Sequence, residues 1–250
     1  MIAFPNAKIN LGLHILSKRK DGFHDIETVF YPLMIHDSLE ILTAGDQETS
    51  FKQYGLPLNS SKNLCEQAYE LLKLEYDLPP VEMHLLKHIP VGAGLGGGSS
   101  DAAFTLLTLN ELFGLGISSL ELEKIAAGLG SDCAFFIRNR PLFATGRGEL
   151  FEPLEIDLSA FEIRMAKPDI HISTPEAYAM ATPKAGRPSL REVITNPIAE
   201  WKDCLFNDFE GPIFDKYPEI RIEKEKMYEQ GAIYAAMSGS GSAVFGIFEG

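Results

Sequence analysis

The chain has few cysteines and no long apolar run. Its 250 residues include three cysteines, Cys65, Cys133 and Cys204, which are widely spaced and form no CxxC pair. An odd number at this spacing indicates neither a disulfide framework nor a zinc site, and it favours the reducing cytoplasm as the compartment. No stretch approaches the ~20 apolar residues that span a bilayer, and the N-terminus lacks a basic segment followed by an apolar run. We therefore expect neither a membrane anchor nor a signal segment.

Positive charge is also scarce. Lys and Arg number 22 against 35 Asp and Glu, which gives a net charge of −13. Binding to nucleic acid or to an anionic membrane relies on clustered Lys and Arg, so this balance disfavours both kinds of partner. We expect a small-molecule ligand, whose anionic groups are met by local donors. The length suits one large or two medium domains, and the sequence gives no indication of the oligomeric state.

Glycine, in contrast, is concentrated in one segment. Residues 90–101 read Pro-Val-Gly-Ala-Gly-Leu-Gly-Gly-Gly-Ser-Ser-Asp. The alternating apolar pattern before this segment predicts a strand over 81–89, and the pattern after it predicts a helix over 102–113. Glycines remove the Cβ atoms that keep a ligand away from the backbone and permit positive φ, and Ser99, Ser100 and Asp101 can cap the helix. A nest of N–H groups at a helix N-terminus predicts a phosphate site.

Three other interpretations of this segment are weaker. A Walker A motif requires Lys-Ser/Thr after its last glycine, and Ser99 follows Gly98 directly, which excludes it. The dinucleotide fingerprint Gly-x-Gly-x-x-Gly is matched over residues 92–97, but the acidic residues about 20 positions later lie in helical sequence instead of ending a second strand. A flexible turn would cost several kcal/mol of chain entropy, at roughly 0.5–1 kcal/mol per glycine, without a structural return.

Polar residues interrupt two other apolar segments. Residues 8–15 alternate, which predicts a half-buried strand with Lys8 and Asn10 on its polar face; by position alone, these are two solvated residues. Asp132 precedes a short apolar helical segment, so its carboxylate can either cap that helix or act as a base. We interpret the neighbouring Cys133 as a small core residue, and we favour surface ion pairs over phosphate contacts for three arginines, Arg138, Arg140 and Arg147.

The glycine segment resembles the nucleotide-binding loop of the GHMP small-molecule kinases, a family that includes galactokinase, homoserine kinase and mevalonate kinase. The resemblance covers Pro-x-Gly-x-Gly-Leu-Gly-Gly-Gly-Ser-Ser at residues 90–100. In that family the loop wraps the phosphates of ATP. The resemblance therefore implies ATP as co-substrate, accompanied by Mg²⁺, and a nucleotide held by Pro90, Gly92, Gly94, Leu95, Gly96, Gly97, Gly98, Ser99 and Ser100.

Further motifs of the family occur in the same order along the chain. Ala-Lys-Ile-Asn-Leu at residues 7–11 is similar to the first motif, which implies that Lys8 lies beside the acceptor hydroxyl and the reacting phosphate and that Asn10 contacts the substrate. Ser-Gly-Ser-Gly at residues 238–241 is explained locally by a hairpin turn and also matches the third motif, a second glycine-rich loop. Leu-Gly-x-Asp-x-x-Phe resembles the segment that supplies the catalytic aspartate. This resemblance implies that Asp132 is the general base and that Lys8 stabilises the developing charge.

A charged turn near the N-terminus is similar to a stretch found in one branch of this family. Arg-x-Asp-Gly-Phe-His at residues 19–24 resembles the branch that phosphorylates a cytidylated methylerythritol, although the branch usually has tyrosine where this chain has Phe23. In that branch the aromatic residue and the next histidine hold the cytosine, which implies this role for Phe23 and His24. A second aromatic residue after Ser-Thr-Pro falls on Tyr178, which could sandwich the base with Phe23. From the residues alone, packing roles for all three are equally plausible.

The resemblance covers essentially the whole chain and implies a two-domain α+β fold. Residues 1–154 would form an N-terminal ATP-binding domain related to domain 2 of ribosomal protein S5, and residues 155–250 a C-terminal α/β sandwich with antiparallel strands. The implied activity is ATP-dependent phosphorylation of the 2-hydroxyl of the cytidylated methylerythritol, in non-mevalonate isoprenoid precursor biosynthesis. The alternatives are a mevalonate-type or homoserine-type kinase of the same family, a nicotinamide-dependent oxidoreductase and an RNA-associated protein.

Overall fold

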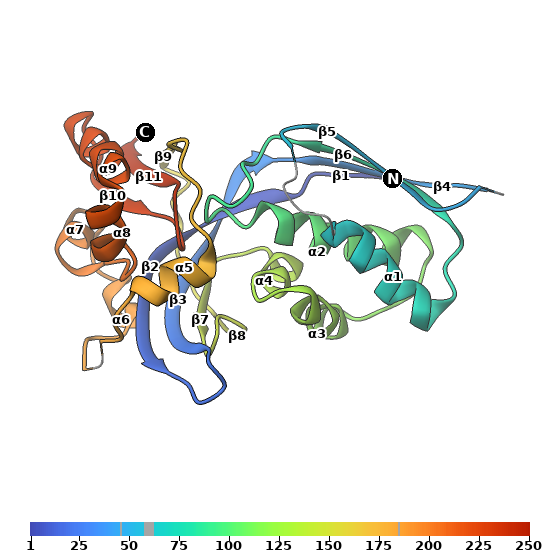
Figure 1. Cartoon of the computed structure of the whole chain (residues 1–250), viewed down its shortest axis with the longest axis horizontal. Coiled ribbons are helices and arrows are strands. Elements are labelled where there is room, and N and C mark those ends of the chain that lie inside the picture. Colours follow the sequence, from blue (N-terminus) through green and yellow to red (C-terminus); the bar gives the residue numbers. More distant parts are fainter. Residues whose placement is uncertain (46, 58–62, 185) are drawn as a thin grey trace. The chain divides into compact units, whose positions relative to one another are not determined.

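The computed structural model describes residues 1–45, 47–57, 63–184 and 186–250. The chain forms two compact units (Figure 1), of which the first comprises Met1–Lys8, Pro32–Val91 and Gly96–Arg140. The second comprises Ile9–Tyr31, Gly92–Leu95 and Pro141–Gly250. This division differs from a single cut after residue 154, because residues 9–31, which are close to the N-terminus, belong to the second unit.

The first unit contains a four-stranded sheet. In spatial order its strands are β1 (Ile2–Ala3), β4 (Ser38–Thr43), β6 (Val81–Lys87) and β5 (Ser50–Gly55). β5 and β6 run parallel and the other pairs are antiparallel. The alternating apolar residues explain the register, because Leu39 of β4 lies opposite Leu85 of β6, Ile41 lies opposite Met83, and all four are buried.

The helices of the first unit pack beside this sheet. They are α1 (Leu64–Tyr76), α2 (Gly97–Leu112), α3 (Ser119–Leu129) and α4 (Cys133–Arg138). α1 packs on α2, and α2 packs on β4, so that these helices cover one face of the sheet (Figure 1). Ser-x-x-Glu at residues 118–121 is a capping-box signature, and the structure confirms it, because Ser118 Oγ accepts a hydrogen bond from the N–H of Glu121.

Strand β2 (Asn6–Lys18) is buried on both faces over residues 6–15, so the expectation of a half-buried strand was wrong. Lys8 and Asn10 are only 3% and 2% exposed. Other segments cover their side of the strand. Lys8 lies close to Gly96, and Asn10 Oδ1 lies close to Gly239.

The second unit contains two sheets. One has the order β2, β3 (His24–His36), β7 (Leu142–Thr145) and β8 (Leu150–Pro153), and the other has the order β10 (Tyr234–Met237), β11 (Val244–Glu249) and β9 (Phe161–Ala166). The pairs β3–β7 and β7–β8 are antiparallel, and so are both pairs of the second sheet. These sheets and the helices around them confirm the predicted α+β class.

The helices of the second unit are short. They are α5 (Thr174–Met180), α6 (Leu190–Val193), the 3₁₀ helix η1 (Ile198–Glu200), α7 (Trp201–Cys204), α8 (Glu210–Lys216) and α9 (Pro218–Glu229). The sequence of residues 207–210 predicts a helix, but α8 begins only at Glu210. The reason is that the side-chain amide of Asn207 donates hydrogen bonds to the carbonyls of Met237 and Gly239, both at 2.8 Å.

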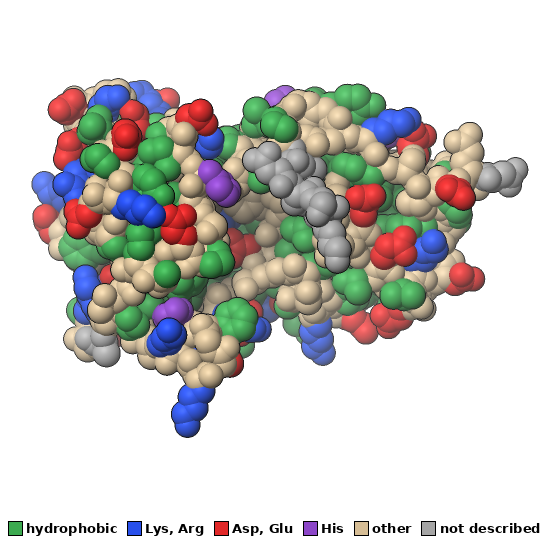
Figure 2. All heavy atoms as spheres, viewed as in Figure 1, with side chains coloured by type: hydrophobic (Ala, Val, Ile, Leu, Met, Phe, Trp, Pro, Cys, Tyr) green, Lys and Arg blue, Asp and Glu red, His purple; other side chains and the backbone are tan. Residues whose placement is uncertain are grey.

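Charge on the molecular surface is mixed. On the face drawn in Figure 2, Lys and Arg side chains lie among Asp and Glu and form no continuous basic surface. Across the described ranges, no helix combines the length and the apolar character that crossing a bilayer requires.

Candidate active site

Lys8 and Asp132 lie together in the first unit. Lys8 Nζ is 3.3 Å from Asp132 Oδ2, with the lysine side chain 4% exposed and the aspartate side chain 31% exposed. Asp132 occupies the N-cap position of α4, but its side chain makes no capping hydrogen bond. The capping role that the sequence left open is therefore wrong. A carboxylate that a ligand can reach, held beside an ammonium group, suits general-base chemistry.

Helix α2 begins at Gly97 and not at residue 102 as expected. Gly96 is its N-cap residue, with a φ of 70° and no side-chain cap. Ser99, Ser100 and Asp101 therefore lie inside the first turns and do not cap the helix, which corrects that expectation. The first N–H groups of a helix have no intrahelical acceptor. Such amides, together with the positive end of the helix dipole, are suited to an anion.

Glycine occupies the five glycine positions of the loop for different structural reasons. At four of them a Cβ atom would come within 3.0 Å of other residues of the chain: Gly92 with His171, Gly94 with Ser238, Gly96 with Phe136 and Gly97 with Ile89. At Gly98 the nearest atom would be Leu64 Cδ1 at 3.8 Å, which is an ordinary contact. Packing thus explains four glycines. A helical glycine costs roughly 0.5–1 kcal/mol relative to alanine, and at Gly98 a closely approaching ligand would justify that cost.

Residues 92–95 of the loop belong to the second unit, where they contact the turn at residues 238–241. Ser238 Oγ donates a hydrogen bond to the carbonyl of Gly94 at 2.8 Å. The N–H of Asn10 donates to the same Ser238 Oγ at 3.3 Å, and the Asn10 side-chain amide donates to Thr28 Oγ1 at 2.8 Å. Asn10 therefore supports this turn, and its predicted contact with substrate stays a prediction.

The structure brings His24 and Tyr178 together in the second unit. Their rings stack with centroids 4.7 Å apart and planes 14° from parallel, and Tyr178 also makes an edge contact with Phe209. Stacked rings at this distance leave no space between them for a base. Burial, and secondarily the charge of Lys18, lowers the pKa of His24. A neutral imidazole offers one donor and one acceptor at its edge.

Phe23 does not share this stack. Its side chain is 54% exposed, and the guanidinium of Arg147 lies 5.0 Å from its ring centroid. The expected sandwich of Phe23 and Tyr178 is therefore not the arrangement seen, because His24 lies on the Tyr178 ring instead.

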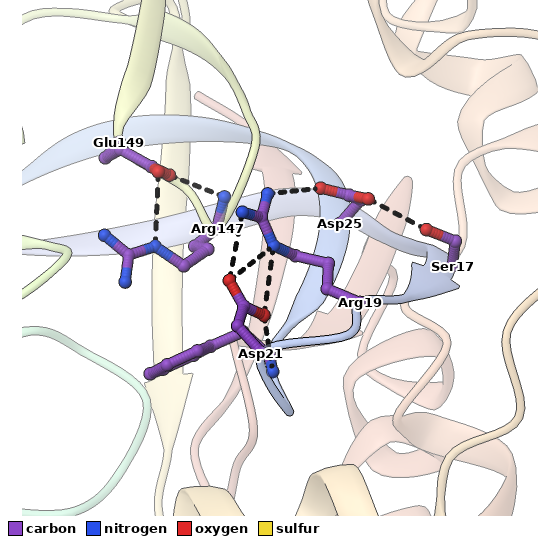
Figure 3. Close-up of polar contacts among 7 residues, drawn as sticks. Ser17, Arg19, Asp21, Asp25, Arg147 and Glu149 are labelled. Atoms are coloured by element: carbon purple, nitrogen blue, oxygen red, sulfur yellow. Dashed lines mark hydrogen bonds and ion pairs between the residues drawn. The ribbon is translucent and has the colours of Figure 1, made fainter.

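A network of charged side chains holds the turn that carries Phe23 (Figure 3). Arg19 donates to Asp21 at 3.1 Å and to Asp25 at 2.9 Å, and the N–H of Phe23 donates to Asp21 at 3.1 Å. Ser17 donates to Asp25, and the hydrogen bonds from Arg19 lower the pKa of Asp21. Nearby, Arg147 is paired with Glu149 (Figure 3). These contacts restrain the turn through side chains of the chain itself.

Sequence reasoning missed a buried charged cluster in the first unit, which we call the buried brace: Asp37, Lys87 and Asp101. Lys87 Nζ donates to Asp101 Oδ2 at 2.7 Å and also to Asp37 Oδ2. Burial, together with the charge of Asp37, raises the pKa of Asp101 to about 7 against the opposing effect of Lys87. Asp37 and Lys87 are in direct contact although they lie 50 positions apart in the sequence, so no local sequence signal links them.

Other residues considered from the sequence have structural roles. Cys133 is fully buried, which confirms it as a core residue, and burial raises the pKa of its thiol to about 12. Arg138 forms a bidentate ion pair with Glu123 at 2.8 Å. Among the residues that the structure describes, no group of three or more His, Cys, Asp or Glu could hold a metal ion.

These features, a glycine loop opening a helix and a lysine–aspartate pair, occur in a chain that matches two family models. The model described as "GHMP kinases N terminal domain" matches residues 63–140, and the model described as "GHMP kinases C terminal" matches residues 189–250. The chain belongs to the GHMP kinase family, and it is an ATP-dependent small-molecule kinase.

Three similar proteins carry the name of one kinase of this family. A protein of Parabacteroides distasonis named "4-diphosphocytidyl-2-C-methyl-D-erythritol kinase" is 54% identical over 100% of this chain and 92% of its own length. A protein of Bacteroides fragilis with the same name is 52% identical over 99% of this chain and 92% of its own length. A solved structure of 4-(cytidine 5'-diphospho)-2C-methyl-D-erythritol kinase superposes with a TM-score of 0.84 at 34% identity, covering 100% of this chain and 91% of that one.

Proposed function

We propose that this protein transfers the γ-phosphoryl group of ATP to the 2-hydroxyl of 4-diphosphocytidyl-2-C-methyl-D-erythritol, a step of non-mevalonate isoprenoid precursor biosynthesis. The similar proteins that carry this kinase name span essentially the whole chain. The observation that carries the chemistry is the Lys8–Asp132 pair at 3.3 Å, beside the start of α2. A Cβ placed on the N-cap residue Gly96 would lie 3.1 Å from Lys8 Cε.

This placement supports a separate role for each of the two residues. Asp132 accepts the proton of the 2-hydroxyl while that oxygen forms a bond to the γ-phosphorus and ADP leaves. Lys8 stabilises negative charge on the attacking oxygen and on the transferring phosphoryl group. The free amides at the start of α2, with Ser99 and Ser100, hold the phosphates, because phosphoryl transfer depends chiefly on positioning and charge stabilisation.

Magnesium enters this proposal as part of the nucleotide. Mg²⁺ is commonly held by one or two carboxylates together with substrate phosphates, without a cage made only of protein ligands. In this proposal the ATP phosphates would supply protein-independent ligands for the ion, and Asp132 stays available to accept the acceptor proton. Bound Mg²⁺ would neutralise phosphate charge.

For the cytosine, the second unit offers the stacked rings of His24 and Tyr178. An aromatic face contributes about 1–3 kcal/mol of stacking per base, so the base would stack on the outer side of His24 or displace it from Tyr178. We predict that His24→Ala raises the KM for the cytidylated acceptor by about tenfold, equivalent to about 1.4 kcal/mol, and leaves the KM for ATP unchanged. An equal rise in both KM values would contradict a base-binding role. An acceptor without a base, such as mevalonate or homoserine, has no use for this platform.

We place the enzyme in the cytoplasm. Cys65, Cys133 and Cys204 are free thiols, which suits a reducing compartment.

The test of the mechanism is Asp132→Asn, which removes the base and keeps the shape of the side chain. We expect kcat to fall by about 10²–10⁴, the usual contribution of a general base, while the dissociation constant for ATP changes little. Asp169→Asn, at a fully exposed carboxylate in the second unit, serves as the control and should retain full turnover. Full turnover by Asp132→Asn would remove this residue from the mechanism.

A further inference from the structure

The buried brace connects both ends of the glycine loop. Asp37 Oδ1 accepts the N–H groups of His88 at 2.6 Å and Ile89 at 2.8 Å, directly before the loop. Asp101, directly after Ser100, completes the brace from the second turn of α2. The same three charged side chains therefore fix the strand end that leads into the loop and the helix that leaves it.

The brace also lies directly beneath the first residue of α2. A Cβ on Gly97 would lie 3.1 Å from Lys87 Nζ and 2.8 Å from Ile89 Cγ2, so the start of the helix packs directly against the ammonium group. The brace side chains are at most 2% exposed. Replacing a buried ionic group by apolar residues is often neutral or stabilising, so stability alone does not account for placing three charges here.

We infer that the buried brace positions the first turn of α2 for nucleotide phosphates, with Asp101 as a positioning residue for nucleotide binding. This inference rests on the proposed function for the identity of the ligand. Loss of the Asp101 carboxylate would leave Lys87 bound to Asp37 alone and would free the helix start from the strand end.

The brace also sets the charge beneath the phosphate site. It contains two carboxylates and one ammonium, so it is neutral when Asp101 is protonated and carries −1 when Asp101 is ionised. From α1, Cys65 is the other titratable group that interacts with Asp101, and burial keeps its pKa far above neutrality, so it remains a thiol. Ionisation of Asp101 therefore adds a negative charge below amides that receive phosphate.

The first test measures MgATP affinity by calorimetry on the full chain without acceptor. We expect Asp101→Ala to weaken MgATP binding by about tenfold or more, equivalent to about 1.4 kcal/mol. At about pH 6, Asp101→Asn should largely restore the affinity, because its amide oxygen still accepts from Lys87 and the wild-type brace is then neutral.

The control is Asp208→Ala in the second unit, which removes a buried carboxylate that accepts from the N–H of Ile15. It should cost stability without changing affinity. Unchanged MgATP affinity in Asp101→Ala, or an equal loss in the control, would overturn the inference.

A second readout serves if Asp101→Ala does not fold. The ratio of the MgATP dissociation constants of the wild type and Asp101→Asn is measured from about pH 6 to about pH 8, so that the ionisation of ATP itself cancels. We expect this ratio to rise several-fold across the range, because only the wild-type brace gains a negative charge. A flat ratio would overturn the inference. If the wild type bound MgATP with this pH dependence but did not phosphorylate the cytidylated acceptor, the proposed acceptor would fail and the brace would stand.

Discussion

Gly96 allows a specific test of how the start of α2 and Lys8, the proposed catalytic residue, fit together. Its φ is +70°, and a Cβ there would lie 3.0 Å from the Phe136 ring and 3.1 Å from Lys8 Cε. Gly96→Ala therefore incurs the cost of a left-handed backbone, about 1–2 kcal/mol, and also pushes Lys8 away by a few tenths of an ångström. A misplacement of about 1 Å costs about 100-fold in rate, so we expect kcat to fall by roughly 4- to 10-fold.

The matched control for this prediction is Gly114→Ala. Gly114 also has a positive φ, +59°, but an added Cβ there would meet no atom within 4 Å. Both variants should lower the Tm by roughly 2–8 °C, because about 1 kcal/mol corresponds to about 2–4 °C in a chain of this size. Steady-state kinetics and thermal denaturation of the two variants check this. Equal turnover in both variants would refute the reasoning that Gly96 controls the position of Lys8.

Two further predictions concern the same helix. The added Cβ of Gly98→Ala would meet only Leu64, at 3.8 Å, so this variant should stabilise the protein by roughly 0.5–1 kcal/mol and yet raise the KM for ATP several-fold. Denaturant unfolding and steady-state kinetics check the two effects. An unchanged KM would show that the nucleotide does not approach this backbone. The second concerns pH. Asp101 has a pKa raised from its ordinary value of 3.8 to about 7 in the folded protein, so the folded state holds a proton that the unfolded chain releases. Between about pH 5 and pH 7 the wild type should therefore lose about 1.4 kcal/mol of unfolding free energy per pH unit relative to Asp101→Asn; parallel stability curves for the two proteins would contradict this.

Local patterns in the sequence were sufficient to predict several elements of the fold. Alternating apolar residues predicted β6, and the Ser-x-x-Glu signature at residues 118–121 predicts the start of α3, because both signals act over a few residues. The start of α2 was misplaced because Gly97 and Gly98 are poor helix formers, and the apolar pattern begins only after them. Tertiary contacts outweigh that low propensity.

The candidate site, like the fold, was predicted from the sequence only in part. Motif resemblance placed Lys8 and Asp132 as a pair, and the structure brings them within 3.3 Å. Alternation could not show that the polar face of β2 is covered, because that depends on segments far away in the chain. The stacking of His24 on Tyr178 and the joining of Asp37 to Lys87 are likewise long-range contacts. The residues in each contact are far apart in the sequence, and a single sequence contains no pattern that pairs them.

The measurement that tests the central claim most directly is ADP release from ATP with three acceptors in parallel: 4-diphosphocytidyl-2-C-methyl-D-erythritol, mevalonate and homoserine. We predict turnover with the cytidylated acceptor alone, and its loss in Asp132→Asn. Turnover with mevalonate or homoserine in place of the cytidylated acceptor would keep the kinase and contradict the proposed substrate.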